Sequence, residues 1–194
     1  RGYKPNPKAH HGQILRAMEM IYKMKRPLFL IGGGAKISGA FDEMTKLMEM
    51  LRIPLVTTIM GRGIVPTNHP LYFGNIGMHG NYAANEAVNS CDLLISIGTR
   101  FNDRITGKLG TFASKAKIIH IDIDTAAISK NVTVDIPIVG DAKDAIQLML
   151  EIAQHEKACD TEPWILKMES WRKKYPIKME EKEKLVPIQV IEAI

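Results

Sequence analysis

The feature that most constrains the fold of this chain is a series of short apolar segments that alternate with segments of helical periodicity. Residues 28–31, LFLI, and residues 93–97, LLISI, are almost unbroken apolar runs. Such runs are typical of strands covered on both faces, as in a parallel sheet. Residues 71–73 offer a further short strand. Together with residues 71–73, the predicted strands are residues 28–31, 53–58, 93–97, 117–124 and 136–140.

Apolar side chains at three- and four-residue spacing predict amphipathic helices between these strands. The predicted helices are residues 8–25, 38–51, 81–90 and 141–156, with a short helix within residues 104–111. Ser38 and Asp141 are the expected N-caps. Strands and helices that alternate in this way predict βαβ units. The expected fold is therefore α/β, a doubly wound, Rossmann-like parallel sheet of five to six strands with helices on both faces.

The order of these segments predicts three parts. Residues 1–26 form an N-terminal linker and the first helix, residues 27–157 a central Rossmann-like domain, and residues 158–194 a connector towards a further domain. Because the chain begins without Met, we expect it to be a piece of a longer protein. A helix is expected to start near Pro163 and to pack its apolar side chains back on the body. These side chains are Trp164, Leu166, Met168 and Trp171.

Composition excludes several classes of protein. No apolar run approaches about 20 residues, so no membrane span is predicted, and the N-terminus lacks the apolar core of a signal peptide. Cys91 and Cys159 are too few for a disulfide framework or a zinc site and suit a reducing cytoplasm. The net charge of +5 is modest, and the late lysines are interspersed with glutamates. We expect a cytoplasmic chain with no metal site and no nucleic-acid or membrane partner.

A glycine turn, Gly32–Gly34, follows the first strand and precedes a helix, which is the context of a phosphate-binding turn. The turn does not complete G-x-G-x-x-G, because Ile37 stands where the last glycine belongs. It is not a P-loop either, since residues 40–41 replace the required Lys-Ser/Thr. The turn has a second explanation, a tight strand-to-helix connection, and the spacing leaves both open.

Charged side chains follow two later strands. Asp122 ends a strand and suits either a ribose hydroxyl or a helix cap. It lies roughly 90 residues after the glycine turn, not the roughly 20 of the standard dinucleotide fingerprint, which disfavours NAD. Arg100 and Arg104 follow another strand and suit a pyrophosphate or surface pairs with Asp103 and Asp92.

Catalytic motifs are not apparent. Met78 and His79 lie between glycines, where the histidine suits a flavin or phosphate oxygen or plain solvation. Neither G-x-S-x-G nor H-E-x-x-H occurs, so we predict no catalytic residue. The residues by themselves indicate an α/β domain that holds a cofactor.

Four segments together resemble the central domain of acetolactate synthase (acetohydroxyacid synthase) large subunits. They are IGMHG at residues 76–80, GTRFNDRITGK at 98–108, HIDID at 120–124 and ISKNVTVDIPIVGDA at 128–142. In that family the outer two of three domains bind thiamine diphosphate with Mg²⁺, and the middle domain binds FAD. The resemblance therefore implies that residues 27–157 are the FAD-binding domain and that the thiamine domains lie outside this chain.

The resemblance also implies which residues contact FAD, with Asp122 and Ile123 facing the adenosine ribose. Met78 and Arg100 match positions that line the channel to the thiamine site. Asn102 and Thr125 depart from the usual Asp and Pro of the family. The implied FAD contacts are Gly32, Gly33, Gly34, Thr58, Ile59, Ile76, Gly77, Met78, His79, Gly98, Arg100, Arg104, Ile105, Asp122, Ile123, Asp141 and Ala142.

The implied activity is that of a transferase in branched-chain amino acid biosynthesis. The family decarboxylates pyruvate on thiamine diphosphate and adds the two-carbon unit to a second 2-keto acid, such as 2-ketobutyrate. FAD is mainly structural there, and the enzyme is a homo-oligomer with a small regulatory subunit. This chain by itself is expected to be inactive. The alternatives are glyoxylate carboligase, a flavin-free catabolic acetolactate synthase, and a non-catalytic nucleotide-binding scaffold.

Overall fold

The computed structural model describes residues 8–176, which contain one six-stranded sheet in which every pairing is parallel. The strand order is β3-β2-β1-β4-β5-β6, the order of a doubly wound Rossmann-like sheet, so the predicted fold is confirmed. The strands are β1 (Pro27–Ile31), β2 (Leu55–Thr57), β3 (Tyr72–Asn75), β4 (Leu93–Ile97), β5 (Lys117–Asp122) and β6 (Ile136–Val139).

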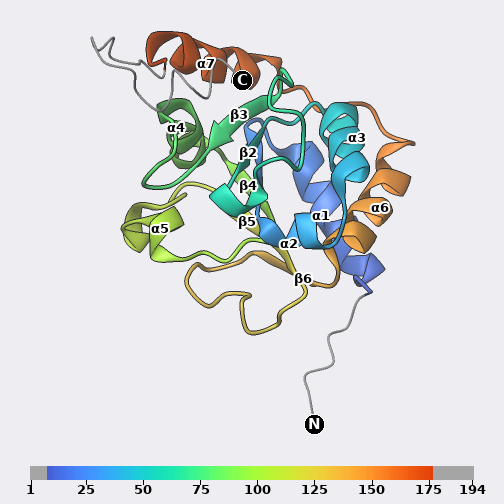
Figure 1. Ribbon diagram of the computed structural model, residues 1–194. Helices are drawn as coiled ribbons and strands as arrows, with labels where there is room; N and C mark the ends of the chain where they lie inside the picture. The colour runs from blue at the N-terminus through green and yellow to red at the C-terminus, as the bar shows by residue number, and fades with distance from the viewer. Residues whose placement is uncertain (1–7, 177–194) are drawn as a thin grey trace.

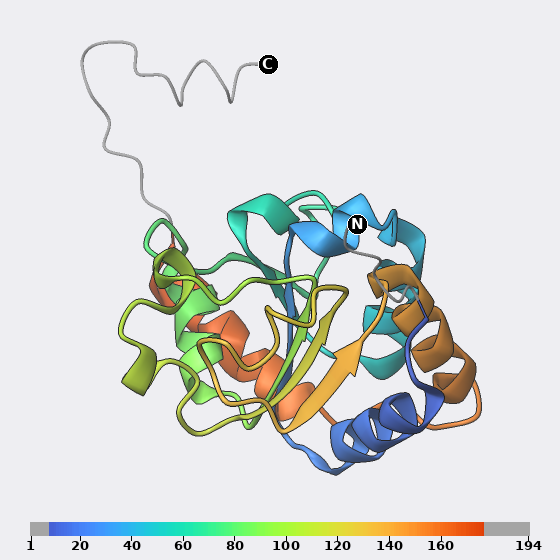
Figure 2. The ribbon, with the colours of Figure 1, turned by 90° about the horizontal axis from the view of Figure 1, so that it is seen from below.

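Helices cover both faces of this sheet (Figures 1 and 2). On one face lie α1 (His11–Lys23), α2 (Gly33–Ile37), α3 (Phe41–Leu51) and α6 (Ala142–Ala153), and on the other lie α4 (Tyr82–Ser90) and α7 (Glu162–Lys174). The short helix α5 (Asp103–Thr106) and the 3₁₀ turns η1 (Ile59–Gly61) and η2 (Leu109–Thr111) belong to connections. No helix within residues 8–176 has the length and apolar character to cross a membrane.

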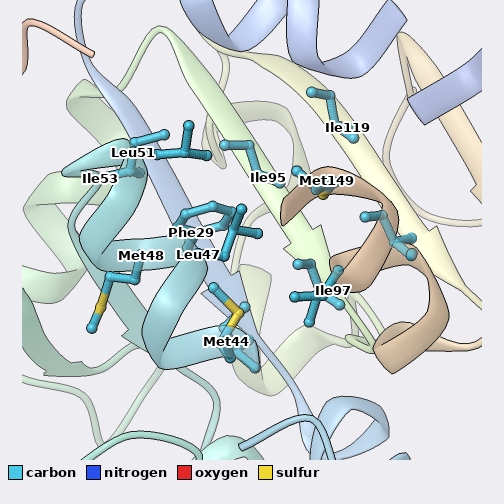
Figure 3. Packing of buried hydrophobic residues seen from close by; sticks show 14 of the residues in the cluster. Phe29, Met44, Leu47, Met48, Leu51, Ile53, Ile95, Ile97, Ile119 and Met149 are labelled. Carbon is cyan, nitrogen blue, oxygen red and sulfur yellow. The ribbon is translucent and has the colours of Figure 1, made fainter. Parts of the chain in front are cut away.

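A row of apolar side chains runs across the three central strands. Phe29, Ile95 and Ile119 are register partners in β1, β4 and β5, and all three are fully buried. Figure 3 shows side chains of α3 and α6 packed over this row, including Leu47 and Met149. Burial of each such side chain contributes about 1.5–3 kcal/mol. The continuous apolar runs in the sequence therefore reflect strands that are covered on both faces.

The opposite face is closed by α7. The Trp164 side chain is 2% exposed, and its Nε1 donates to the carbonyl oxygen of Pro27 at 3.1 Å. Met168 is buried as predicted, but Leu166 is 59% exposed, so the expectation that it packs on the body is wrong. Residues 164 and 168 are four apart and share one helix face, whereas residue 166 points away from it. The predicted connector beyond residue 176 lies outside the described residues.

Ser38 is not the N-cap of a long helix, as predicted, but the C-cap of the short helix α2. Gly39, with φ +71°, then separates α2 from α3. Ser38 Oγ donates to Asp141 Oδ1 at 2.6 Å and accepts from the Lys143 amide at 2.8 Å. Asp141 is the N-cap of α6, as predicted. Ser38 thus supports the start of a helix other than its own.

Candidate cofactor-binding site

The loops that follow β1, β2, β4, β5 and β6 meet at one edge of the sheet, because the carboxyl ends of parallel strands share an edge. Together they line a cavity of about 580 Å³ where the strand order reverses between β1 and β4. The predicted site residues that line it are Gly32, Gly33, Gly34, Thr58, Gly98, Arg100, Ile105, Asp122, Ile123, Asp141 and Ala142.

The floor of this cavity is backbone. The amide of Gly32 donates to the Ile97 carbonyl at 2.9 Å, and the amide of Gly34 donates to the Gly98 carbonyl at 3.0 Å. Gly98 has φ +60°, a conformation that favours glycine. Within residues 8–176 the Gly33 amide donates to no backbone carbonyl, so it is available to a ligand.

Two carboxylates form the wall beyond β5 and β6. Asp122 Oδ1 accepts from the Asp124 amide at 2.8 Å. Asp141 Oδ1 accepts from the Lys143 and Asp144 amides at the start of α6. Asp122 therefore caps the loop after β5, whereas Asp141 caps α6. Oδ2 of each accepts no hydrogen bond from the described residues, so it can accept one from a ligand hydroxyl.

The two predicted arginines line different cavities. Arg100 lies on the first cavity, whereas Arg104 lies on a second one of about 340 Å³. Ile105 lines both, so the two cavities adjoin. Neither guanidinium forms an ion pair within the described residues, and Asp92 instead accepts from the Lys25 and Arg26 amides. The alternative of surface pairs with Asp92 and Asp103 is therefore not what the structure contains.

The loop that carries Met78 is tied to α5. The Met78 amide donates to the Arg104 carbonyl at 3.1 Å, and the Gly77 amide donates to Asn85 Oδ1 at 2.8 Å. The Met78 side chain is 77% exposed and, with Ile76 and Gly77, lines the second cavity. His79 and Ile59 line neither cavity, and their role as contacts stays a prediction.

Some lining residues were not predicted. Ile37, at the end of α2, and Met60, in η1, are apolar, strongly exposed and on the first cavity. Thr99 lines the same cavity and is buried. The imidazole Nε2 of His120, inside the apolar strand β5, lies 2.9 Å from the Thr99 carbonyl oxygen. A histidine within an otherwise apolar strand was the signal available in the sequence.

Comparison with known families identifies the chain. The family described as thiamine pyrophosphate enzyme, central domain, matches residues 14–149. The chain belongs to this family. The matched range holds all six strands and both cavities. The fold and the loops that line the cavities are therefore those of a thiamine pyrophosphate enzyme central domain.

Individual relatives of this central domain are named acetolactate synthase large subunits, which confirms the resemblance found in the sequence. The chain is 51% identical over 164 residues to the probable large subunit of Methanocaldococcus jannaschii, covering 84% of the chain and 28% of that relative. It is 38% identical over 199 residues to the isozyme 3 large subunit of Escherichia coli, covering 100% and 35%. The chain thus spans about a third or less of these relatives.

Proposed function

We propose that this chain is the FAD-binding central domain of a thiamine-diphosphate-dependent acetolactate synthase. The observation that carries the proposal is the cavity whose floor is made by the turns Gly32–Gly34 and Gly98, which leave no side chain between ligand and backbone. A diphosphate needs this close approach of the backbone. The two adjoining cavities, about 580 and 340 Å³, have volumes in the range of cofactor-binding pockets.

The placement of carboxylates favours FAD over NAD. In the standard NAD fingerprint an acidic residue ends the second strand and binds the ribose. Here β2 ends at Thr57, and Thr58 and Ile59 follow it. The carboxylates lie instead on the opposite side, at Asp122 and Asp141. We therefore place the adenosine ribose of FAD beyond β5 and β6, with the Gly33 amide and Arg100 at the diphosphate.

The flavin end is expected at the second cavity. Arg104, Ile105 and the loop with Met78 line it, and the Met78–Arg104 backbone bond holds its two sides together. FAD in this role is structural and carries no net redox step. This chain contributes no catalytic group; its own residues bind and orient.

The names of the relatives support a proposal for the activity of the whole protein. We propose that it condenses pyruvate with a second 2-keto acid, such as 2-ketobutyrate, in branched-chain amino acid biosynthesis. Thiamine diphosphate and Mg²⁺ would be held by domains outside residues 1–194. The name large subunit, borne by the relatives, supports a small subunit as partner. We further propose that the enzyme is a homo-oligomer, that the small subunit is regulatory, and that the enzyme lies in the cytoplasm.

Isothermal titration of the chain with FAD, FMN, ADP and NAD tests the proposal. We expect weak binding of FAD and ADP and no binding of NAD. NAD carries the same adenosine diphosphate as FAD, so its failure to bind would mean that its nicotinamide end does not suit the second cavity. Preference for NAD contradicts the proposal. Absence of binding to all four favours the flavin-free enzyme. The chain by itself is expected to form no acetolactate from pyruvate and thiamine diphosphate.

A further inference from the structure

His120 is a fully buried polar residue in the middle of β5. Its side chain faces the α4 and α7 side of the sheet, where the ring packs edge-on against Phe101 with 4.9 Å between centroids. Nε2 lies 2.9 Å from the Thr99 carbonyl oxygen and 3.8 Å from Asp122 Oδ2. A carbonyl oxygen only accepts, so Nε2 carries the hydrogen and Nδ1 is bare.

Core stability does not explain a histidine at this position. Among the described residues, Nδ1 of His120 has no hydrogen-bond partner, and neither has Oγ of Ser96, its register partner on β4. A buried polar atom without a partner costs free energy that an apolar side chain of similar size would avoid. Within residues 8–176 the hydrogen bond that the imidazole gains in return is the one to the Thr99 carbonyl, and Asp122 Oδ2 lies 3.8 Å from the same nitrogen.

That bond reaches the loop that carries Arg100. Thr99 follows Gly98, whose backbone contacts Gly34, and its hydroxyl donates back into the sheet, to the Leu30 and Ile97 carbonyls at 3.4 and 3.3 Å. The His120 imidazole holds the same residue by its carbonyl. Arg100, the next residue, is exposed and lines the first cavity. The path of the backbone at Thr99 therefore fixes the point at the cavity from which the Arg100 side chain extends.

We propose that His120 is a positioning residue, whose Nε2–H fixes the Thr99 carbonyl and thereby aims Arg100 at the diphosphate of the ligand. The proposal rests on the function proposed above, since it concerns the affinity for FAD. On this proposal His120 has two roles, to fill space in the core and to orient a residue of the site. The imidazole serves the site through one hydrogen bond, while its ring fills space in the core as an apolar side chain would.

The test compares H120L, H120Q and S96A with the wild-type chain. Leucine fills the space but has no donor, whereas the amide nitrogen of glutamine reaches the position of Nε2. S96A is the matched control, because it removes a buried polar atom on the same sheet face without touching Thr99. We expect H120L to bind FAD about fivefold more weakly and to resist urea somewhat less well, because the carbonyl of buried Thr99 loses its donor. H120Q and S96A should bind FAD within about twofold of wild type.

Equal affinity of H120L and wild type overturns the proposal, and so does a folded H120Q as weak as H120L. If the wild-type chain does not bind FAD, the proposed function fails, and hydrogen exchange of residues 99–104 then decides the inference alone. Faster exchange of that segment in H120L but not in H120Q supports it, and equal exchange overturns it. If H120L does not fold, ring ¹⁵N chemical shifts of the wild-type imidazole decide: Nε2–H supports the proposal, and Nδ1–H overturns it.

Discussion

A methyl group on Gly32 would lie 2.2 Å from the carbonyl oxygen of Gly98. The turns after β1 and β4 are therefore in backbone contact at the point where the strand order reverses. No side chain fits between them, and the space above them stays open to a ligand. This contact explains why a glycine turn that completes no standard dinucleotide motif still forms the floor of a cavity.

Gly32→Ala tests this contact. We expect a loss of at least about 2 kcal/mol in the free energy of unfolding, because backbone atoms on both sides must move apart. Urea unfolding measures it. Gly110→Ala is the control, since a methyl group there meets no atom within 4 Å and is expected to be near neutral. Equal stability of the two variants would contradict the close packing of the turns.

Arg100→Gln and Arg104→Gln test whether the two arginines contact different parts of FAD. Arg100 lines the cavity with Asp122 and Asp141, so we expect about tenfold weaker binding of both ADP and FAD. Arg104→Gln should weaken FAD but leave ADP nearly unchanged, because Arg104 lines only the second cavity. Titration calorimetry measures both ligands, and Arg16→Gln on α1 is a control of equal charge change. If ADP affinity falls equally in both variants, the assignment of the adenosine diphosphate to the first cavity and of the flavin end to the second is wrong.

Trp164→Phe tests the attachment of α7. The substitution removes the donor to the Pro27 carbonyl and leaves a buried acceptor, at an expected cost of about 1–3 kcal/mol in unfolding free energy. Leu166→Ala, on the same helix but exposed, should change stability by less than about 0.5 kcal/mol. Denaturant unfolding followed by tryptophan fluorescence, or by circular dichroism for the Phe variant, compares the two. A larger loss for the leucine variant would contradict the packing of α7.

The stability of the chain should decrease below about pH 6.5. Burial lowers the pKa of His120 from its ordinary value of 6.5, although Asp122 and the Thr99 carbonyl act in the opposite direction. As the pH falls through 6.5, the unfolded chain gains a proton that the folded chain does not bind, so stability is lost until the pH reaches the lowered pKa. Above that window this residue adds no pH dependence. Urea unfolding at about pH 7.5 and about pH 5.5 should show a smaller decrease in H120Q than in wild type.

Both cysteines should resist alkylation in the folded chain. Burial raises the pKa of Cys91 to about 12 and that of Cys159 to about 11, so the reactive thiolate is scarce at neutral pH. Iodoacetamide followed by mass spectrometry should find both thiols free in the native chain and both alkylated in urea. Rapid labelling of either cysteine without denaturant would show that its surroundings open.

Local features of the chain were predictable from the sequence. The strand Leu93–Ile97 has the bounds that its apolar run predicts, and Asp141 caps α6 as its position before the helix predicts. Both depend on neighbours within a few residues, as burial patterns and caps do. The parallel fold followed from the alternation of such segments. Membership of the family followed from four motifs, which matched without any knowledge of the coordinates.

Other features were decided only by tertiary contacts. The sequence predicted Ser38 as a cap for its own helix, but the hydroxyl bonds to Asp141, 103 residues away. Two arginines four residues apart suggested one shared ligand group, but the fold places them on different cavities. His120 met Thr99 only through the pairing of β4 and β5. Hydrogen bonds between distant segments depend on how strands and loops are brought together in space, and that arrangement is not encoded in the spacing of residues along the chain.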